Sequence, residues 1–116
     1  MKLNRYKTLA EAKRRLRARG FTNRFELKAK NRMYCLDNGR EYTPDEMRII
    51  EHHRFESRGN SSKQSVIFAV ICHDNTRATI VSADGPYADI ALSLFMDKVK
   101  ILERVTTRTL YTSIIQ

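Results

Sequence analysis

The longest apolar run of the chain, SVIFAVICH at residues 65–73, constrains its fold more than any other feature. The run is rich in β-branched and aromatic residues, which suit a pleated strand. Successive side chains of a strand point to opposite faces, so Val66 and Phe68 share one face. Ile67 and Ala69 share the other face. A strand that is apolar on both faces is typically central in its sheet and covered from both sides.

The size and composition of the chain are those of one globular domain. Its 116 residues are 41% hydrophobic and 30% charged, which argues against disorder. We expect a single domain over residues 1–104 and a separate tail at 105–116. The first seven residues contain no apolar run, so we expect no secretory signal, no membrane contact and a cytoplasmic protein. Cys35 and Cys72 lack CxxC spacing and are expected to be buried free thiols.

Local patterns predict one helix and a series of strands before and after the central run. Thr8-Leu9-Ala10-Glu11 is a capping box, which predicts a helix over about residues 9–19 that ends at Gly20. Perfect alternation of apolar and charged residues predicts a half-buried strand at 25–30. Further strands are predicted at residues 33–36, 40–42, 48–56 and 77–83, with one helical turn at 43–47.

A second helix is expected to follow the last of these strands. Pro86 suits the first helical position, so the helix is predicted to begin there and to run to about residue 102. Its apolar stripe is expected to comprise Tyr87, Ile90, Ala91, Leu94, Phe95, Ile101 and Leu102, with Met96 and Val99 outside it.

These elements predict an α+β fold in which a five- to six-stranded antiparallel sheet has the N-terminal and C-terminal helices packed on one face. The second face of the central strand would then need another cover. We therefore expect a homo-oligomer, most simply a homodimer through that face or through the tail. The tail is rich in Thr, Ile and Tyr, which suits an added or exchanged strand.

The positive charge of the chain is concentrated near its N-terminus. Residues 1–40 hold 13 Lys/Arg and 3 Asp/Glu, a net charge of +10, whereas residues 41–116 hold 9 and 10, a net charge of −1. This asymmetry indicates an acidic partner such as nucleic acid, or else a solvated, solubilising surface. The candidate nucleic-acid-binding residues are Lys13, Arg14, Arg15, Arg17 and Arg19, whose cations would neutralise phosphates.

Other chemistry finds less support in the sequence. His52 and His53 are adjacent on a predicted strand and point to opposite faces, and the same holds for Cys72 and His73, so no metal site is expected. A buried Cys72 would also be an inert nucleophile. No cofactor is expected.

The turn at residues 84–89 is the remaining candidate site, with Asp84, Gly85, Tyr87 and Asp89 as its ligand residues. A strand that runs directly into a helix can present backbone N–H groups to a ligand. The acidic side chains would repel phosphate, so a cation or a hydroxyl-bearing ligand suits the turn better. The alternative is a purely structural strand-to-helix turn.

Several segments together resemble a known family. LAEAKRRLRARGFTNRF at residues 9–25, RFE at 54–56, SVIFAV at 65–70 and VSADGPYAD at 81–89 are similar to small uncharacterised bacterial proteins of about this length. The resemblance covers roughly residues 8–100. Some members bear the automatic label phosphoribosylpyrophosphate synthetase. The label implies a longer, doubly wound enzyme with a Thr/Gly-rich ribose-phosphate loop. This chain is shorter and lacks such a loop. The resemblance thus supports the domain boundaries without supplying a function.

The leading expectation is a small non-enzymatic cytosolic binding or regulatory module. The first alternative is a nucleic-acid-binding protein that uses the basic helix. The second is a small-ligand or phosphoribosyl-related enzyme that uses the turn at residues 84–89 together with His53 or His73.

Overall fold

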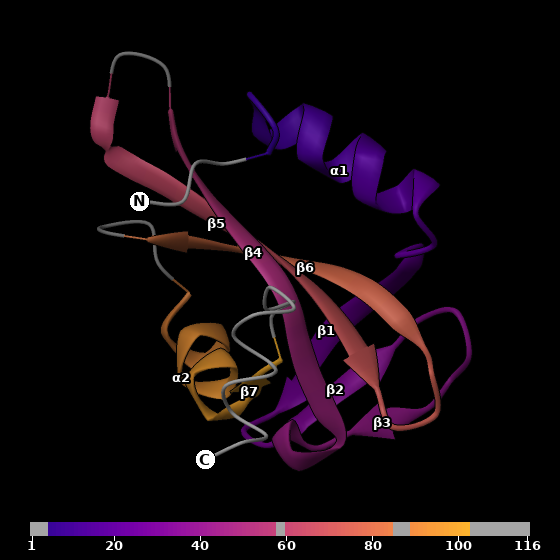
Figure 1. The fold of residues 1–116 in the computed structure, drawn as a ribbon. Helices are drawn as coiled ribbons and strands as arrows, with labels where there is room; N and C mark the ends of the chain where they lie inside the picture. Colours follow the sequence, from indigo (N-terminus) through magenta and orange to yellow (C-terminus); the bar gives the residue numbers. More distant parts are fainter. Residues whose placement is uncertain (1–4, 58–59, 85–88, 103–116) are drawn as a thin grey trace, which may run out of the picture.

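The computed structural model describes residues 5–57, 60–84 and 89–102 and shows an α+β fold (Figure 1). The predicted N-terminal helix, the six predicted strands and the helical turn are all present, and residues 65–72 of the apolar run lie in the longest strand, β5. The elements in chain order are α1 (Leu9–Ala18), β1 (Asn23–Ala29), β2 (Arg32–Cys35), β3 (Glu41–Tyr42), a 3-10 turn η1 (Pro44–Glu46), β4 (Met47–Ser57), β5 (Asn60–Cys72), β6 (Arg77–Asp84), α2 (Ile90–Lys98) and β7 (Lys100–Ile101).

The strands form one curled sheet in the order β3-β2-β1-β6-β5-β4-β7. Two antiparallel meanders, β1 to β3 and β4 to β6, join through a short parallel pairing of Asn23 and Arg24 with Ala78 and Thr79. After α2 the chain returns as β7, parallel to β4. The sheet is therefore mixed and seven-stranded, not antiparallel with five or six strands. Local patterns do not show which meander edges meet, and a two-residue strand has no periodicity to recognise.

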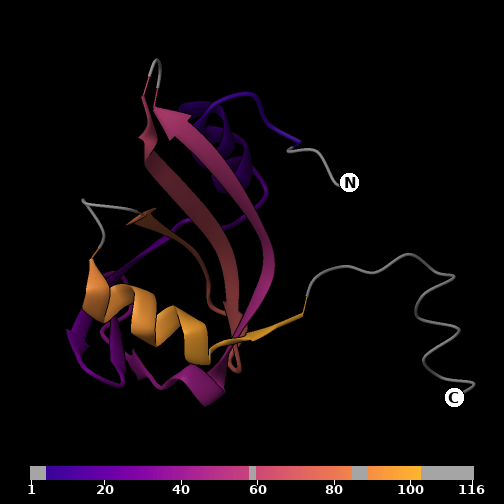
Figure 2. The same ribbon diagram turned by 90° about the vertical axis from the view of Figure 1, so that its left-hand side faces the viewer.

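The two helices cover opposite faces of the sheet, which corrects the prediction that they share one (Figures 1 and 2). On one face, α1 packs Ala12 and Leu16 against Ile67 and Ala69 of β5. On the other face, α2 packs against the concave side of the curled sheet, and its Phe95 belongs to the larger core cluster. The crossover from β6 through α2 to β7 places this helix on the opposite side.

Both faces of β5 are thus covered by elements of the same chain. The larger core cluster comprises Met33, Cys35, Tyr42, Met47, Ile49, Val70, Cys72, Ala78, Ile80, Phe95, Met96 and Val99. The bare second face that suggested a homodimer is therefore occupied over the inner part of the strand. The predicted tail at residues 105–116 lies outside the described residues.

The N-terminal helix begins and ends as the sequence predicts. The Thr8 hydroxyl accepts a hydrogen bond from the Glu11 backbone N–H at 3.0 Å. Gly20 has a φ of 100°, a left-handed conformation that glycine adopts without strain. Phe21 then turns back beneath the helix, where only 5% of its surface is exposed. This turn brings the start of β1 alongside α1.

The second helix starts later than predicted and buries a different side. It begins at Ile90, with Asp89 as its N-cap, and ends at Lys98. Met96 and Val99 are buried, whereas the predicted stripe residues Ile90, Leu94, Ile101 and Leu102 are all more than half exposed. Apolar residues occur around most of this short helix, so periodicity alone could not identify its buried side.

Candidate functional site

The basic residues of α1 fall into two groups in the structure. All five predicted side chains, those of Lys13, Arg14, Arg15, Arg17 and Arg19, belong to exposed residues. Two of them have acidic partners: Arg15 lies 3.9 Å from Glu11, and Arg19 pairs with Glu51. Among the described residues, Lys13, Arg14 and Arg17 form no direct ion pair, although hydrogen bonds from Arg24 and, more weakly, the charge of Arg17 lower the pKa of Asp37.

These three cations line a groove of about 580 Å³ between α1 and the start of β1. The groove is bounded by Ala10, Lys13, Arg14, Arg17, Phe21, Thr22, Asn23, Arg24, Phe25 and Thr79. Sequence reasoning missed Arg24, which the turn at Gly20 and Phe21 places opposite the helix. A tight turn after a basic helix is the signal that could have revealed it.

Arg24 is less available to a ligand than the cations of the helix. Its guanidinium lies 3.0 Å from Asp37, which also accepts a 2.6 Å hydrogen bond from the Arg24 backbone N–H. Both hydrogen bonds lower the pKa of Asp37, which therefore stays ionised at neutral pH. Lys13, Arg14 and Arg17 consequently supply most of the uncompensated positive charge of the groove.

The groove lacks an open aromatic platform at Phe21. The guanidinium carbons of Arg19 and Arg77 lie 5.7 and 5.6 Å from the centre of its ring. These cation–π contacts and the burial of the ring leave no free face on which a nucleic-acid base could stack. The groove can therefore bind phosphates through its cations, but Phe21 does not provide base recognition.

Arg19 belongs to a partly buried polar cluster beneath α1, not to the groove. Its two terminal nitrogens donate to the Glu51 carboxylate at 3.1 and 2.8 Å, and one also donates to the Tyr6 hydroxyl at 2.8 Å. His53 Nε2 lies 2.9 Å from Glu51 Oε1. Burial alone raises the pKa of Glu51, but hydrogen bonds from Arg19 and His53 outweigh it and lower that pKa to about 2. The cluster fixes the helix to β4.

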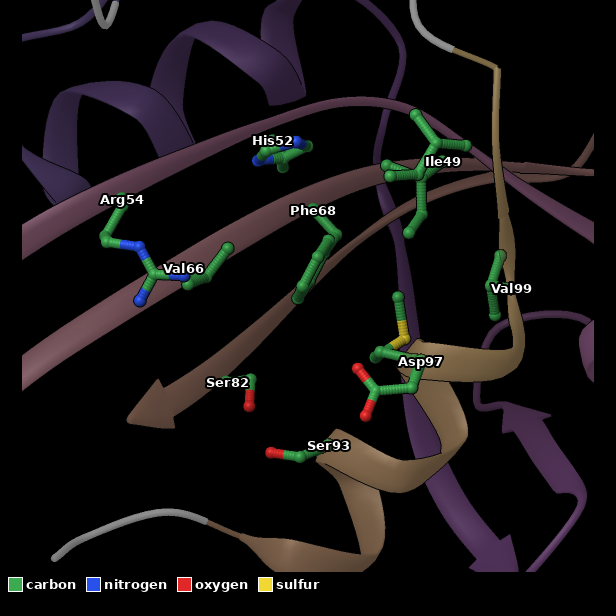
Figure 3. Close-up of a pocket in the computed structure, with 11 residues that line it drawn as sticks. Ile49, His52, Arg54, Val66, Phe68, Ser82, Ser93, Asp97 and Val99 are labelled. Atoms are coloured by element: carbon green, nitrogen blue, oxygen red, sulfur yellow. The ribbon is translucent and has the colours of Figure 1, made fainter. Parts of the chain in front are cut away.

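Besides the basic groove, the structure has a hollow of about 340 Å³ between α2 and strands β4 to β6 (Figure 3). It lies on the face of the sheet that α2 covers, opposite to the face that α1 covers. Its apolar lining includes Val66 and Phe68 of β5 and Met96 of α2. Polar side chains project from both sides, with Ser93 and Asp97 on the helix. The sheet side contributes His52, Arg54 and Ser82.

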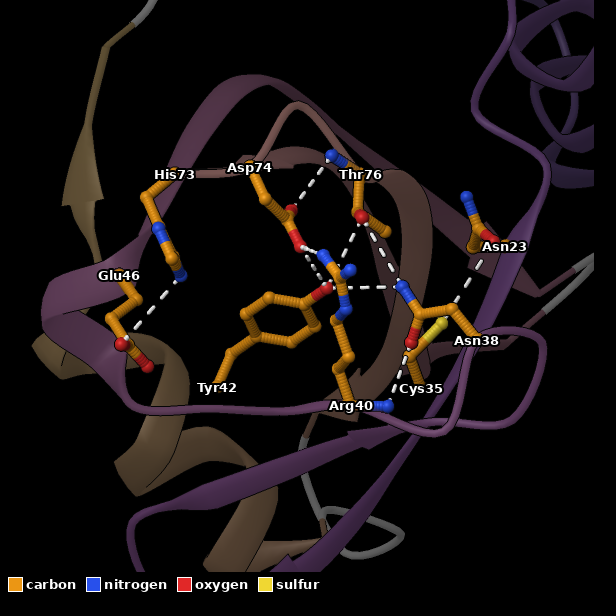
Figure 4. Close-up of polar contacts among 9 residues, drawn as sticks. All are labelled: Asn23, Cys35, Asn38, Arg40, Tyr42, Glu46, His73, Asp74 and Thr76. Atoms are coloured by element: carbon orange, nitrogen blue, oxygen red, sulfur yellow. Dashed lines mark hydrogen bonds and ion pairs between the residues drawn. The ribbon is translucent and has the colours of Figure 1, made fainter.

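A further polar network joins the β2–β3 hairpin to the turn between β5 and β6 (Figure 4). Asp74 accepts from the Tyr42 hydroxyl and from Arg40, both at 2.7 Å, and from the Thr76 backbone N–H at 3.0 Å. Burial raises the pKa of Asp74, but these hydrogen bonds outweigh it and hold that pKa well below its usual range. Each carboxylate oxygen is thus already engaged, so the network is structural.

The histidines and cysteines do not converge on a site. His53 is engaged with Glu51, and His73 lies 3.7 Å from Glu46. Cys35 and Cys72 are buried free thiols, as predicted, and burial raises the pKa of Cys72 to about 12. Within the described ranges, no group of three His, Cys, Asp or Glu side chains is placed to hold a metal ion.

The predicted ligand turn is only partly described. Gly85 and Tyr87 lie outside the described residues, as does the side chain of Asp84, whose backbone ends β6. Asp89 accepts a hydrogen bond from the Leu92 backbone N–H at 3.1 Å and so caps α2. This contact gives Asp89 a structural role.

Comparison of the chain with models of known protein families, with curated proteins and with solved structures found no match in any of the three. In the parts of the chain that the structure describes, neither helix has the length and apolar character needed to cross a membrane.

Proposed function

We propose that the protein is a cytoplasmic, non-enzymatic module that binds nucleic acid through the groove between α1 and β1. The observation that supports this proposal is the convergence of Lys13, Arg14 and Arg17, which make no direct ion pair among the described residues, on one groove. Cations grouped in this way neutralise neighbouring phosphates and release their counterions.

The expected mode of binding is independent of base sequence. Phosphate contacts position a nucleic acid without reading its bases, and Phe21 is unavailable for stacking. Three phosphate contacts give a slope of log affinity against log salt of about −2 for a single strand and about −3 for a duplex. We therefore expect weak binding at physiological salt and much tighter binding at low salt.

Fluorescence polarisation with mixed-sequence oligonucleotides over a range of salt concentrations tests the proposal. The double substitution Lys13→Gln and Arg17→Gln is expected to reduce the single-strand slope to about −0.7, because one of three phosphate contacts remains. The matched control, Lys98→Gln and Lys100→Gln, removes the same charge from α2 and β7 on the other side of the sheet.

The comparison of the two variants decides the proposal. Retention of the wild-type slope in the control, with its loss in the groove variant, would support the groove as the binding site. Equal weakening of both variants would show that only net charge matters and would contradict the proposal. So would the absence of binding by the wild-type protein at low salt.

We also propose that the chain self-associates through the outer side of α2 and β7. Ile90, Leu94, Ile101 and Leu102 are 53–71% exposed, and their burial against a second copy of the chain would remove apolar surface from water. Light scattering at rising protein concentration tests this, with Leu94→Glu as the variant expected to lower the mass. A monomer at high concentration would contradict the proposal.

A further inference from the structure

The hollow between α2 and strands β4 to β6 has the size of a small-molecule site. Its volume of about 340 Å³ lies at the lower end of ligand pockets, which are mostly apolar with a few placed polar groups. It lies on the face of the sheet opposite to α1 (Figures 1 and 3). We propose that this hollow binds a small organic amine, in which an apolar body carries an ammonium group.

Ser82 of β6 provides the first observation that indicates a ligand. Only 4% of this residue is exposed, and its hydroxyl makes no hydrogen bond with the described residues. In the described part of the chain, no fully enclosed side-chain oxygen lacks a partner, so the Ser82 hydroxyl is open to the hollow that it lines. Figure 3 shows it pointing toward α2. A largely buried hydroxyl is costly without a hydrogen bond, so it is available to a ligand donor.

The helix side of the hollow adds a hydroxyl and a carboxylate. Ser93 and Asp97 are four residues apart on α2, so their side chains are neighbours on one side of the helix. Both line the hollow, and the Asp97 carboxylate points toward the sheet in Figure 3. Neither side chain makes a hydrogen bond or ion pair within the described ranges. Together with Ser82, they give the hollow three groups that can accept hydrogen bonds, one of them negatively charged.

These acceptors favour a ligand with N–H donors and a positive charge. A protonated amine has several N–H donors and no acceptor, as a lysine side chain has, so it satisfies acceptor oxygens without competing for donors. A carboxylate ligand would instead be repelled by Asp97. A neutral hydroxyl can bind the same oxygens, but it forms weaker hydrogen bonds because it carries no charge.

The two basic side chains of the lining are already engaged. His52 and Arg54 have interaction partners in the structure, and Arg54 donates to Gln64 at 3.3 Å. Arg54 and Ser82 are register partners of the same residue, Val66, so two strand spacings, about 10 Å, separate their backbones. This separation is comparable with the Debye length at about 0.1 M salt, so salt weakens the repulsion between Arg54 and an amine beside Ser82.

The remaining lining accommodates the apolar body of the ligand. Val66 and Met96 are 5% and 4% exposed, and Phe68 is half-buried between them and the hollow. Contact of a hydrocarbon with these side chains removes apolar surface from water. Asp97 is exposed, so solvent screens its charge and limits what the ion pair contributes. We therefore expect a dissociation constant of about 1 mM.

Nuclear magnetic resonance titration of the full-length protein with 2-phenylethylamine tests the proposal. Two analogues are ligand controls, 2-phenylethanol with a neutral hydroxyl and 3-phenylpropanoate with a carboxylate. We expect saturable amide shifts at Ser82, Ser93 and Asp97 with the amine, and at least about threefold weaker binding of each analogue. Asp97→Asn should weaken the amine by about threefold without weakening the alcohol. Ser82→Ala should weaken the amine by about fivefold, because it removes an acceptor.

The matched protein control is Glu26→Gln, which removes an exposed carboxylate from β1 and should leave amine binding unchanged. Absence of saturation by about 20 mM 2-phenylethylamine and isoamylamine would overturn the proposal. Equal affinity of the wild-type protein for the amine and the alcohol would also overturn it, as would equal weakening of the amine by Glu26→Gln and Asp97→Asn. The comparison of amine with alcohol uses the wild type alone, so it decides the proposal even where the amide spectrum of a variant shows loss of folding.

Discussion

The carboxylate of Glu51 is expected to stabilise the folded state in a strongly pH-dependent manner. It is 9% exposed and accepts hydrogen bonds from both terminal nitrogens of Arg19 and from His53. The perturbation is Glu51→Gln, which retains the shape of the side chain and removes its charge. Arg19 then remains partly buried without its anion, a costly arrangement.

The pKa of Glu51 gives the magnitude and the sign of the effect. Hydrogen bonds outweigh burial and lower this pKa from 4.5 to about 2, which corresponds to about 3 kcal/mol of folding free energy. A carboxylate whose folded-state pKa is lowered stabilises the protein fully above its unfolded pKa. That contribution is lost as the pH falls through the folded value, to about 1.4 kcal/mol at pH 3 and about 0.4 kcal/mol at pH 2.

Urea denaturation at a series of pH values measures the free energy of unfolding of both proteins. The difference between wild type and Glu51→Gln should be about 3 kcal/mol at pH 7 and should nearly vanish at pH 2. Glu26→Gln, an exposed carboxylate, is the control and should differ little at any pH. A Glu51→Gln difference below about 1 kcal/mol at pH 7, or one that persists at pH 2, would refute the reasoning.

Three further predictions follow from burial and hydrogen bonding. Met96→Ala should lower the free energy of unfolding by about 2–5 kcal/mol, whereas Leu94→Ala should lower it by less than about 1 kcal/mol. Urea titrations of the two variants that gave the reverse order would contradict the assigned buried side of α2. Arg19→Gln should cost about 2 kcal/mol of stability while leaving the salt slope of oligonucleotide binding unchanged, so a reduced slope would place Arg19 in the groove. Cys72 should resist a thiol reagent at about pH 8 until the protein unfolds, because burial raises its pKa to about 12; rapid labelling of the native protein at this position would contradict that.

Much of the fold could be predicted from the sequence because its signals are local. The capping box at Thr8 and the alternation that begins at Phe25 specify their elements through neighbouring residues alone. The apolar run at residues 65–73 likewise identified β5 and the need to cover both its faces. These features depend on periodicity and capping, which are independent of the remaining chain.

The remaining features depend on contacts between distant segments. The pairing of Arg19 with Glu51 joins residues 32 positions apart, and it turns a predicted binding residue into a structural one. Arg24 enters the groove only because the chain turns back at Phe21. The buried side of α2 is the side that packs against the concave face of the curled sheet, so Met96 is buried and Leu94 is exposed.

The short parallel pairing between β1 and β6 has a consequence for the mechanics of the sheet. In the described parts of the chain, backbone pairing between the two meanders involves only two residues in each strand. Three residues of this joint, Asn23, Arg24 and Thr79, also line the basic groove. A polyanion held between α1 and β1 would therefore cross-link the two halves of the sheet and slow amide hydrogen exchange along their shared border, because binding raises the free energy of any opening that destroys the site.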